Sequence, residues 1–259
     1  MSLIITLLAT RRYTIKKLNM HPRIGTYAES FSKKNWGKEA RTFEERTAEM
    51  TRVFALECDQ VHKTHVGFKW MTNQHQDHEP ARMSAWLGET RTKLLFLWRR
   101  SLLREYVSQV VLDADPSAAH ASSSAKAAST AGVSVTLPIG AALLRALDKI
   151  LKARATTAAF YEALPSLTIY YEDVVESSKL YNQTWSGVLA FLGVPDLALD
   201  VITESLVIHA DKPLLASVSN AAAVLQSLRR PCGTSRRSSY GTMCAELALP
   251  RSLGAPPTN

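Results

Sequence analysis

The stretch KLLFLWRRSLLREYVSQVVLD, residues 93–113, decides the fold that the sequence predicts. Its first six residues are apolar except for one leading lysine, which is typical of a buried strand in a parallel sheet. Ser101 then offers the side chain of a helix N-cap, and the apolar residues after it recur with helical spacing. Arg99 and Arg100 therefore stand where the strand gives way to the helix. Ligands of open α/β sheets bind beyond the carboxyl ends of the strands, so this junction and the helix face carrying Ser108 predict an anion-binding crevice.

Strands and helices are also predicted along the rest of the chain. Apolar and β-branched runs predict strands at 3–9, 65–71 and 167–171. Helical periodicity predicts helices at 42–59, at 137–163, up to the FLGVP segment of 191–195, and at 221–228. The pattern favours an α/β fold with a central, mainly parallel sheet flanked by helices.

Length and composition favour one main domain. At 259 residues and 46% hydrophobic content the chain can bury one sizeable core. We expect a single domain over 1–240, with a flexible insert rich in alanine and serine near 114–135 and a disordered tail at 241–259. The formal net charge of +8 favours anionic partners: phosphorylated cofactors, nucleic acid or a membrane surface. No long polybasic arm and no zinc-finger spacing occurs.

The cysteines, histidines and first residues exclude several classes of protein. Three cysteines far apart indicate neither a disulfide framework nor a zinc site, and the histidines between 62 and 78 lack any ligand spacing, so no metal is expected. The opening MSLIITLLATRR is too short for a membrane span and has the wrong flanks for a signal peptide. No transmembrane segment is expected, and the expected location is cytoplasmic, with the Golgi lumen open if the N-terminus is incomplete.

Several segments, in order along the chain, share a pattern with one known family. They are N-x-H-P at 19–22 with Glu29 ahead of Phe31, GFKWM at 67–71, Arg100 followed eight residues later by Ser108, YEDVV with FLGVP after a strand, and a closing Gly233-Thr234. Together they resemble sulfotransferases that use PAPS (3′-phosphoadenosine 5′-phosphosulfate), of the plant-type and carbohydrate branch that includes nodulation and trehalose sulfotransferases. The resemblance implies a P-loop-NTPase-like three-layer sandwich.

The resemblance also implies a reaction, sulfuryl transfer from PAPS to a hydroxyl acceptor, and roles for catalytic residues. Glu29 would be the general base that removes the proton of the acceptor. Lys69, at a strand end, would stabilise negative charge on the sulfuryl oxygens or the leaving phosphate. Structural interpretations stay open beside these roles: a loop glutamate for Glu29, and for Lys69 a strand lysine whose head reaches solvent.

Cofactor-binding residues follow from the same resemblance. Arg100 and Ser108 would bind the 3′-phosphate, since an arginine offers a fixed fork of donors to such a group. Tyr171 would border the adenine. The remaining candidates are Arg12 and Thr14 for the 5′-phosphosulfate, and Gly233 and Thr234 near the 3′-phosphate.

The chain departs from the family at the first loop. In the family, small and glycine residues after an arginine let backbone N–H groups wrap the phosphosulfate at a helix N-terminus. Here Arg12 runs directly into Tyr13, Thr14 and Ile15, and the loop is too short. Three explanations stay open: an incomplete gene model or splice form, loss of tight cofactor binding, or a glycine-free substitute built from Arg11, Arg12 and Thr14.

Two alternatives to an active sulfotransferase follow from the sequence. One is a non-catalytic relative that binds nucleotide weakly or not at all. The other is a basic nucleic-acid-associated protein, whose binding would be independent of nucleotide sequence and would weaken steeply with salt. The resemblance implies a small-molecule or glycan hydroxyl acceptor and no specific nucleic acid as partner, while the identity of the acceptor and the oligomeric state cannot be read from the sequence.

Overall fold

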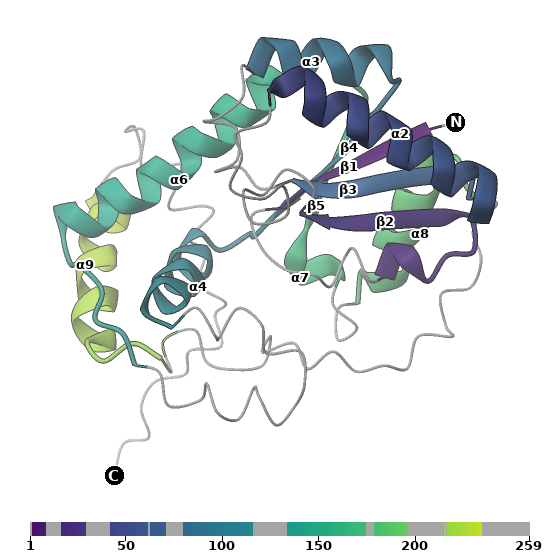
Figure 1. Ribbon diagram of the computed structural model, residues 1–259. Helices are drawn as coiled ribbons and strands as arrows, with labels where there is room; N and C mark the ends of the chain where they lie inside the picture. Colours follow the sequence, from purple (N-terminus) through teal and green to yellow (C-terminus); the bar gives the residue numbers. More distant parts are fainter. Residues whose placement is uncertain are drawn as a thin grey trace. The chain divides into compact units, whose positions relative to one another are not determined.

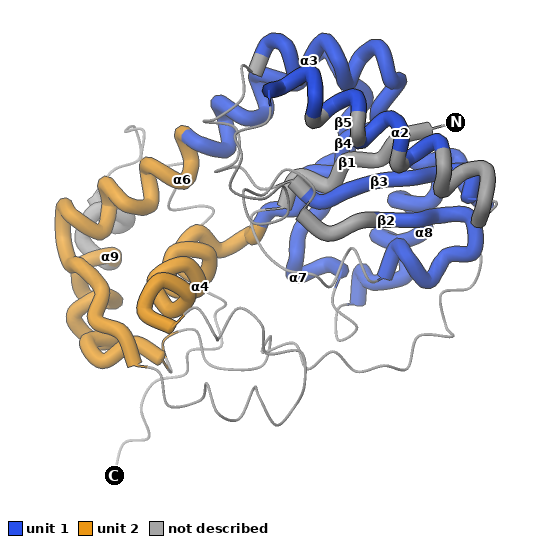
Figure 2. Tube along the Cα trace, in the orientation of Figure 1, with its two compact units in different colours: residues 1–98, 153–208 blue, residues 99–152, 209–259 orange. Residues whose placement is uncertain are grey.

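The computed structural model describes residues 2–8, 17–29, 42–61, 63–70, 80–115, 134–174, 179–195, 215 and 217–234. The chain divides into two compact units, coloured separately in Figure 2. Unit 1 comprises Met1–Trp98 and Ala153–Ile208, and unit 2 comprises Arg99–Lys152 and His209–Asn259. The candidate residues Arg12 and Thr14, most of the expected insert and the expected tail lie outside the described residues.

A five-stranded parallel sheet forms the centre of unit 1 (Figure 1). Its order is β2-β3-β1-β4-β5, and all four neighbouring pairs run parallel. The strands are β1 (Ser2–Leu8), β2 (Ile24–Glu29), β3 (His65–Trp70), β4 (Lys93–Trp98) and β5 (Ser166–Tyr170). The predicted α/β class with parallel strands is therefore confirmed.

β4 is buried on both faces, which explains its unbroken apolar sequence. Leu94, Phe96 and Trp98 belong to one core cluster, while Leu95 and Leu97, which alternate with them, are also buried. The first set packs with Phe68 of β3 and with apolar residues of α2 (Phe43–Val61) and α3 (Pro80–Glu89). Those helix residues are Met50, Phe54, Met83 and Leu87.

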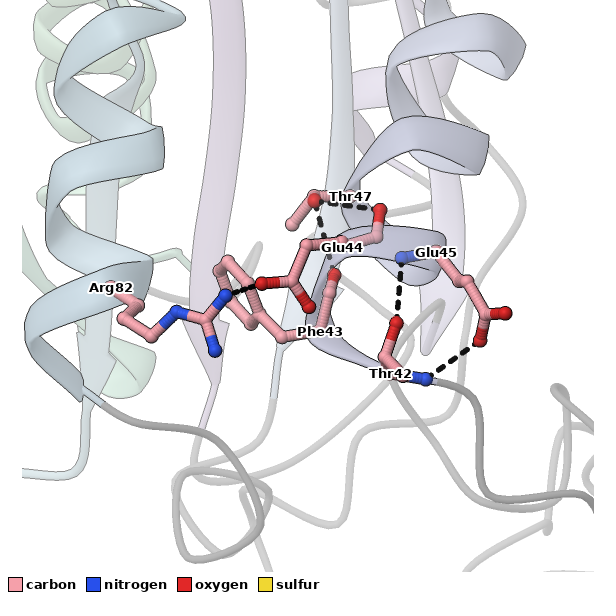
Figure 3. A network of polar contacts seen from close by, with 6 residues as sticks. All are labelled: Thr42, Phe43, Glu44, Glu45, Thr47 and Arg82. Carbon is pink, nitrogen blue, oxygen red and sulfur yellow. Dashed lines mark hydrogen bonds and ion pairs between the residues drawn. The ribbon is translucent and has the colours of Figure 1, made fainter.

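The N-terminus of α2 carries a reciprocal capping box (Figure 3). The backbone N–H of Thr42 donates to Glu45 Oε2 at 2.8 Å, and the Glu45 N–H donates to Thr42 Oγ1 at 3.2 Å. In the same first turn Glu44 pairs with Arg82 of α3, whose guanidinium lies 4.8 Å from the centre of the Phe43 ring. These contacts fix where α2 begins and tie it to α3.

Two more helices of unit 1 follow β5. α7 (Tyr171–Val174) begins directly after the strand, and α8 (Tyr181–Leu192) ends at Gly193, whose φ is +78°. The N–H groups of Gly193 and Val194 both donate to the Leu189 carbonyl oxygen. This closure is a glycine C-cap, and it explains why the FLGVP segment terminates the helix as predicted.

Unit 2 has its own apolar core. It is built from α4 (Leu102–Ala114), the first part of α6 (Ala141–Phe160) and α9 (Ala221–Thr234). Its buried members are Leu102, Leu103, Val107, Val135, Leu137, Leu143, Leu147, Val218, Val224 and Leu228. Asn220 joins two of its segments, because its side chain donates to the Leu137 carbonyl oxygen at 2.7 Å and accepts from the Leu137 N–H at 3.1 Å.

Several elements differ from the sequence-based expectation. The structure adds β2 and α3, which the sequence did not predict. α6 begins at Ala141 rather than at 137, because Leu137 is held by Asn220 and Pro138 follows it. Ala114 closes α4, and Val135 is a buried residue that forms a parallel bridge with Val218, so both ends of the expected insert belong to the structure of unit 2.

One further absence concerns membranes. Of the helices that the structure describes, none combines the length and the apolar character needed to cross a bilayer.

Candidate functional site

The candidate site lies where the parallel strands of unit 1 end. Because all five strands run in the same direction, their carboxyl ends share one edge of the sheet. Glu29 is the last residue of β2, Lys69 is the next-to-last residue of β3, and Tyr171 directly follows β5. These three predicted site residues therefore lie at the same edge of the sheet. Tyr171 follows β5, which is the strand farthest from β2 in the sheet order.

Glu29 and Lys69 are neighbours in the sheet. Pairing between β2 and β3 is regular up to Tyr27 opposite Phe68, and the next pair is Glu29 opposite Lys69. Ala28 is thus an extra residue, a bulge of the kind that often occurs beside functional sites. Lys69 is only 5% exposed. The structure describes the backbone of Glu29 but not its side chain. Glu29 therefore belongs to a strand, not to a loop.

The N-x-H-P motif holds the strand that carries Glu29. The Asn19 side chain donates to the Thr26 carbonyl oxygen at 2.9 Å and accepts from the Thr26 N–H, so it pairs with β2 at the outer edge of the sheet. His21 is 1% exposed and accepts a hydrogen bond from the Arg23 N–H at 3.1 Å. Both motif residues thus have a structural role in positioning β2.

Tyr171 is buried at the start of α7, with 4% of its surface exposed. The next two residues, Glu172 and Asp173, lie in the first turn of that helix, where carboxylates interact favourably with its positive end. This position suits a role of both carboxylates in helix stability.

A cation that sequence analysis missed also lies at this edge. The guanidinium of Arg154, on α6, stands 5.1 Å from the centre of the Trp98 ring, and Trp98 is the last residue of β4. Both residues belong to unit 1. The only sequence signal was a basic residue within a helical segment, which does not reveal a position over a strand end.

Arg100 and Ser108 flank the first turns of α4 in unit 2. Arg100 is exposed and lies two residues after the end of β4, whereas Arg99 is only 8% exposed. Ser101 is the N-cap as predicted, since its hydroxyl accepts a hydrogen bond from the Arg104 N–H at 3.3 Å. Ser108 is half-buried within the helix. Glu105, predicted for the polar face, is buried instead.

Gly233 and Thr234 occupy a different kind of position from the one expected. They are the last two residues of α9, which continues beyond the predicted end at 228. They therefore do not form a separate loop after the helix.

No metal centre is evident in the described ranges. Within them, no three histidine, cysteine, aspartate or glutamate side chains gather closely enough to hold a metal ion. Lys69, Arg154 and Tyr171 bring an ammonium, a guanidinium and a phenol to the end of the sheet.

Comparison with known protein families and with curated protein sequences finds no match.

Proposed function

We propose that the protein is a sulfotransferase that moves a sulfuryl group from PAPS to a hydroxyl acceptor, with a carbohydrate as the proposed acceptor class. The observation that carries the proposal is the register of Glu29 with Lys69 at the carboxyl edge of an all-parallel sheet. A potential base and a buried cation therefore occupy paired positions on two neighbouring strands, at the edge where α/β proteins bind their ligands.

The reaction needs one proton acceptor and one group that stabilises negative charge. The acceptor oxygen forms a bond to sulfur while the bond from sulfur to the 5′-phosphate oxygen breaks. Glu29 takes the hydroxyl proton, and the electron pair of the broken bond leaves with PAP (adenosine 3′,5′-bisphosphate). Lys69, poorly solvated at 5% exposure, would stabilise the charge that develops on the transferred and leaving oxygens.

The residues at the strand ends provide groups suited to the adenine nucleotide. Arg100 is exposed and therefore accessible to a phosphate, and it precedes the N-terminus of α4, whose first N–H groups favour anions. Tyr171 offers an aromatic ring for the adenine border. Arg12 and Thr14 remain proposed contacts of the 5′-phosphosulfate.

The finer architecture belongs to the same proposal. We infer a P-loop-NTPase-like three-layer sandwich. β1 is the central strand: the chain leaves it toward β2 on one side and later crosses it to reach β4 on the other. The direction of the connections therefore reverses at β1, and ligands of open α/β sheets bind at such a switch point.

A sulfuryl-transfer assay with PAPS and a panel of sugars and simple alcohols tests the proposal. Glu29→Gln should lower kcat by about 10²- to 10⁴-fold, because the amide cannot accept the proton. Glu162→Gln, a change at an exposed glutamate of the same unit, is the matched control and should retain full activity.

Two outcomes would overturn the assignment of roles. Equal activity of Glu29→Gln and the wild type would show that Glu29 is not the base. Binding of PAP by the wild type without turnover on any acceptor would indicate the non-catalytic relative instead.

A further inference from the structure

The C-terminal end of α8 is held by two basic side chains from the starts of β3 and β4, the strands on either side of β1. Lys93, the first residue of β4, donates through Nζ to the carbonyl oxygens of Phe191 at 2.8 Å and Leu192 at 3.0 Å. His65, the first residue of β3, lies with Nε2 3.0 Å from the same Leu192 oxygen. These carbonyls belong to the last turn, which leaves its acceptors unpaired within the helix. We call the Lys93 and His65 side chains the α8 clamp.

The contacts of His65 define which tautomer its neutral ring adopts when the clamp is closed. His65 is 8% exposed, and its Nδ1 lies 2.9 Å from Thr64 Oγ1. A neutral ring with its hydrogen on Nε2 satisfies both contacts, since Nε2–H donates to Leu192 and Nδ1 accepts from the hydroxyl. After protonation the hydroxyl can turn to the Arg23 carbonyl oxygen, 3.5 Å away. Hydrogen bonding alone therefore does not oppose protonation.

The charges around His65 do oppose it. The charged or titratable groups that act on it within the described residues are Lys93 and His21, with Lys63 reaching the backbone of His21 at 3.5 Å. α8 carries no charged residue of its own. Burial is the largest cause that lowers the pKa of His65 from its ordinary 6.5. The hydrogen bond to the Leu192 carbonyl raises this pKa, and the charge of Lys93 lowers it.

We propose that the α8 clamp is a proton-operated latch, in which protonation of His65 beside Lys93 releases the last turn of α8 and the turn at Gly193. In the open state His65 is solvated and binds a proton more strongly than in the closed state. Acid therefore favours the open state, and the latch is closed above the ordinary pKa of histidine. The latch is independent of sulfuryl transfer.

Hydrogen exchange of the intact chain tests the latch. Protection factors, corrected for the intrinsic effect of pH, are measured for the amides of 188–194 and, as an internal reference, of α3. Between about pH 7.5 and about pH 5.5 the protection at the end of α8 should fall at least about threefold, and that of α3 should fall less. In His65→Gln, whose amide can still donate to Leu192 without titrating, the extra fall at α8 should disappear.

Lys93→Met is the second variant, in case His65→Gln does not fold. Without the neighbouring ammonium His65 is protonated more easily in the closed state, so the fall in protection at α8 should be smaller than in the wild type. Equal falls at α8 and α3 in the wild type would overturn the proposal. An undiminished fall at α8 in either variant would overturn it as well.

Discussion

Glu29 lies opposite Lys69 across strands β2 and β3, because the extra residue Ala28 shifts the register of β2 by one position. In a regular pairing Ala28 would take that place. A bulge at the last pair of two parallel strands re-aims the strand end, and such irregularities are retained where they position a functional residue. The register thus turns two residues that lie far apart in the sequence into neighbours at the edge where ligands bind.

Replacing Lys69 by methionine should separate catalysis from stability. Methionine fills a similar volume at this position, where 5% of the residue is exposed, so the fold should be retained. The value of kcat should fall by about 10²- to 10³-fold, since a donor to the developing charge is lost. The exposed Lys149→Met is the control. A fall in stability together with full activity would assign Lys69 to the core alone.

Loss of the α2 capping box should destabilise the protein. Thr42→Ala removes the hydroxyl that accepts from the Glu45 N–H, and it should lower the free energy of unfolding by about 1 kcal/mol in urea titration. Thr51→Ala, in the middle of the same helix, removes a hydroxyl that only donates to the Thr47 carbonyl oxygen. That control should change the stability by less than about 0.5 kcal/mol. Equal effects would show that the cap does not stabilise α2.

The two glycines of the α8 region should respond to alanine in opposite directions. Gly193 has a φ of +78°, and an added Cβ would lie 3.7 Å from Lys93 Nζ, an ordinary contact. Gly193→Ala should therefore cost about 1–2 kcal/mol of backbone strain. Gly187 lies within the helix with open space around a new Cβ, so Gly187→Ala should stabilise by about 0.5–1 kcal/mol. Denaturant midpoints of the two variants that shift in the same direction would contradict this account.

Stability at alkaline pH should depend on Tyr161. Its ring is fully buried, and burial raises the pKa of its hydroxyl well above the ordinary value of 10.0. The unfolded chain then loses this proton before the folded chain does, so the free energy of unfolding falls as the pH rises above about 10. In Tyr161→Phe the slope of stability against pH in this range should be smaller. Identical slopes would place Tyr161 in contact with solvent.

Elements that depend on short-range features of the sequence were predicted from it. The apolar run of β4 and the Ser101 N-cap are where the sequence indicated, because burial on both faces and a capping hydroxyl are local requirements. The end of α8 was equally readable, since glycine is favoured at the left-handed position that closes it.

Elements that depend on distant partners were not predicted. β2 has no continuous β-branched run, and it is a strand because it pairs with β3 and because Asn19 bonds Thr26. α3 did carry a readable signal, with Pro80 in its first turn and Met83 and Leu87 one helical turn apart. The burial of Glu105 has no counterpart in the local pattern, which placed this residue on the polar side of α4.

For the site, the sequence predicted strand ends at or beside Lys69, Arg100 and Tyr171. The strand-end position of Glu29 and its pairing with Lys69 came from the structure, because β2 was not predicted. No spacing rule relates two residues joined by a bulged pair of parallel strands. Arg154 was missed for the same reason, because its place over Trp98 depends on the packing of α6 and not on a motif.

Calorimetric titration of the purified chain with PAP and with AMP (adenosine 5′-monophosphate) tests the central claim most directly. We predict that PAP binds at least about tenfold more tightly than AMP, because a charge-assisted bond to the 3′-phosphate contributes about 1.5–3 kcal/mol. Arg100→Ala should reduce the affinity for PAP to that for AMP, and Arg145→Ala, a change at another exposed arginine, should leave it intact. A wild-type chain that binds neither nucleotide, or both equally, would contradict the account.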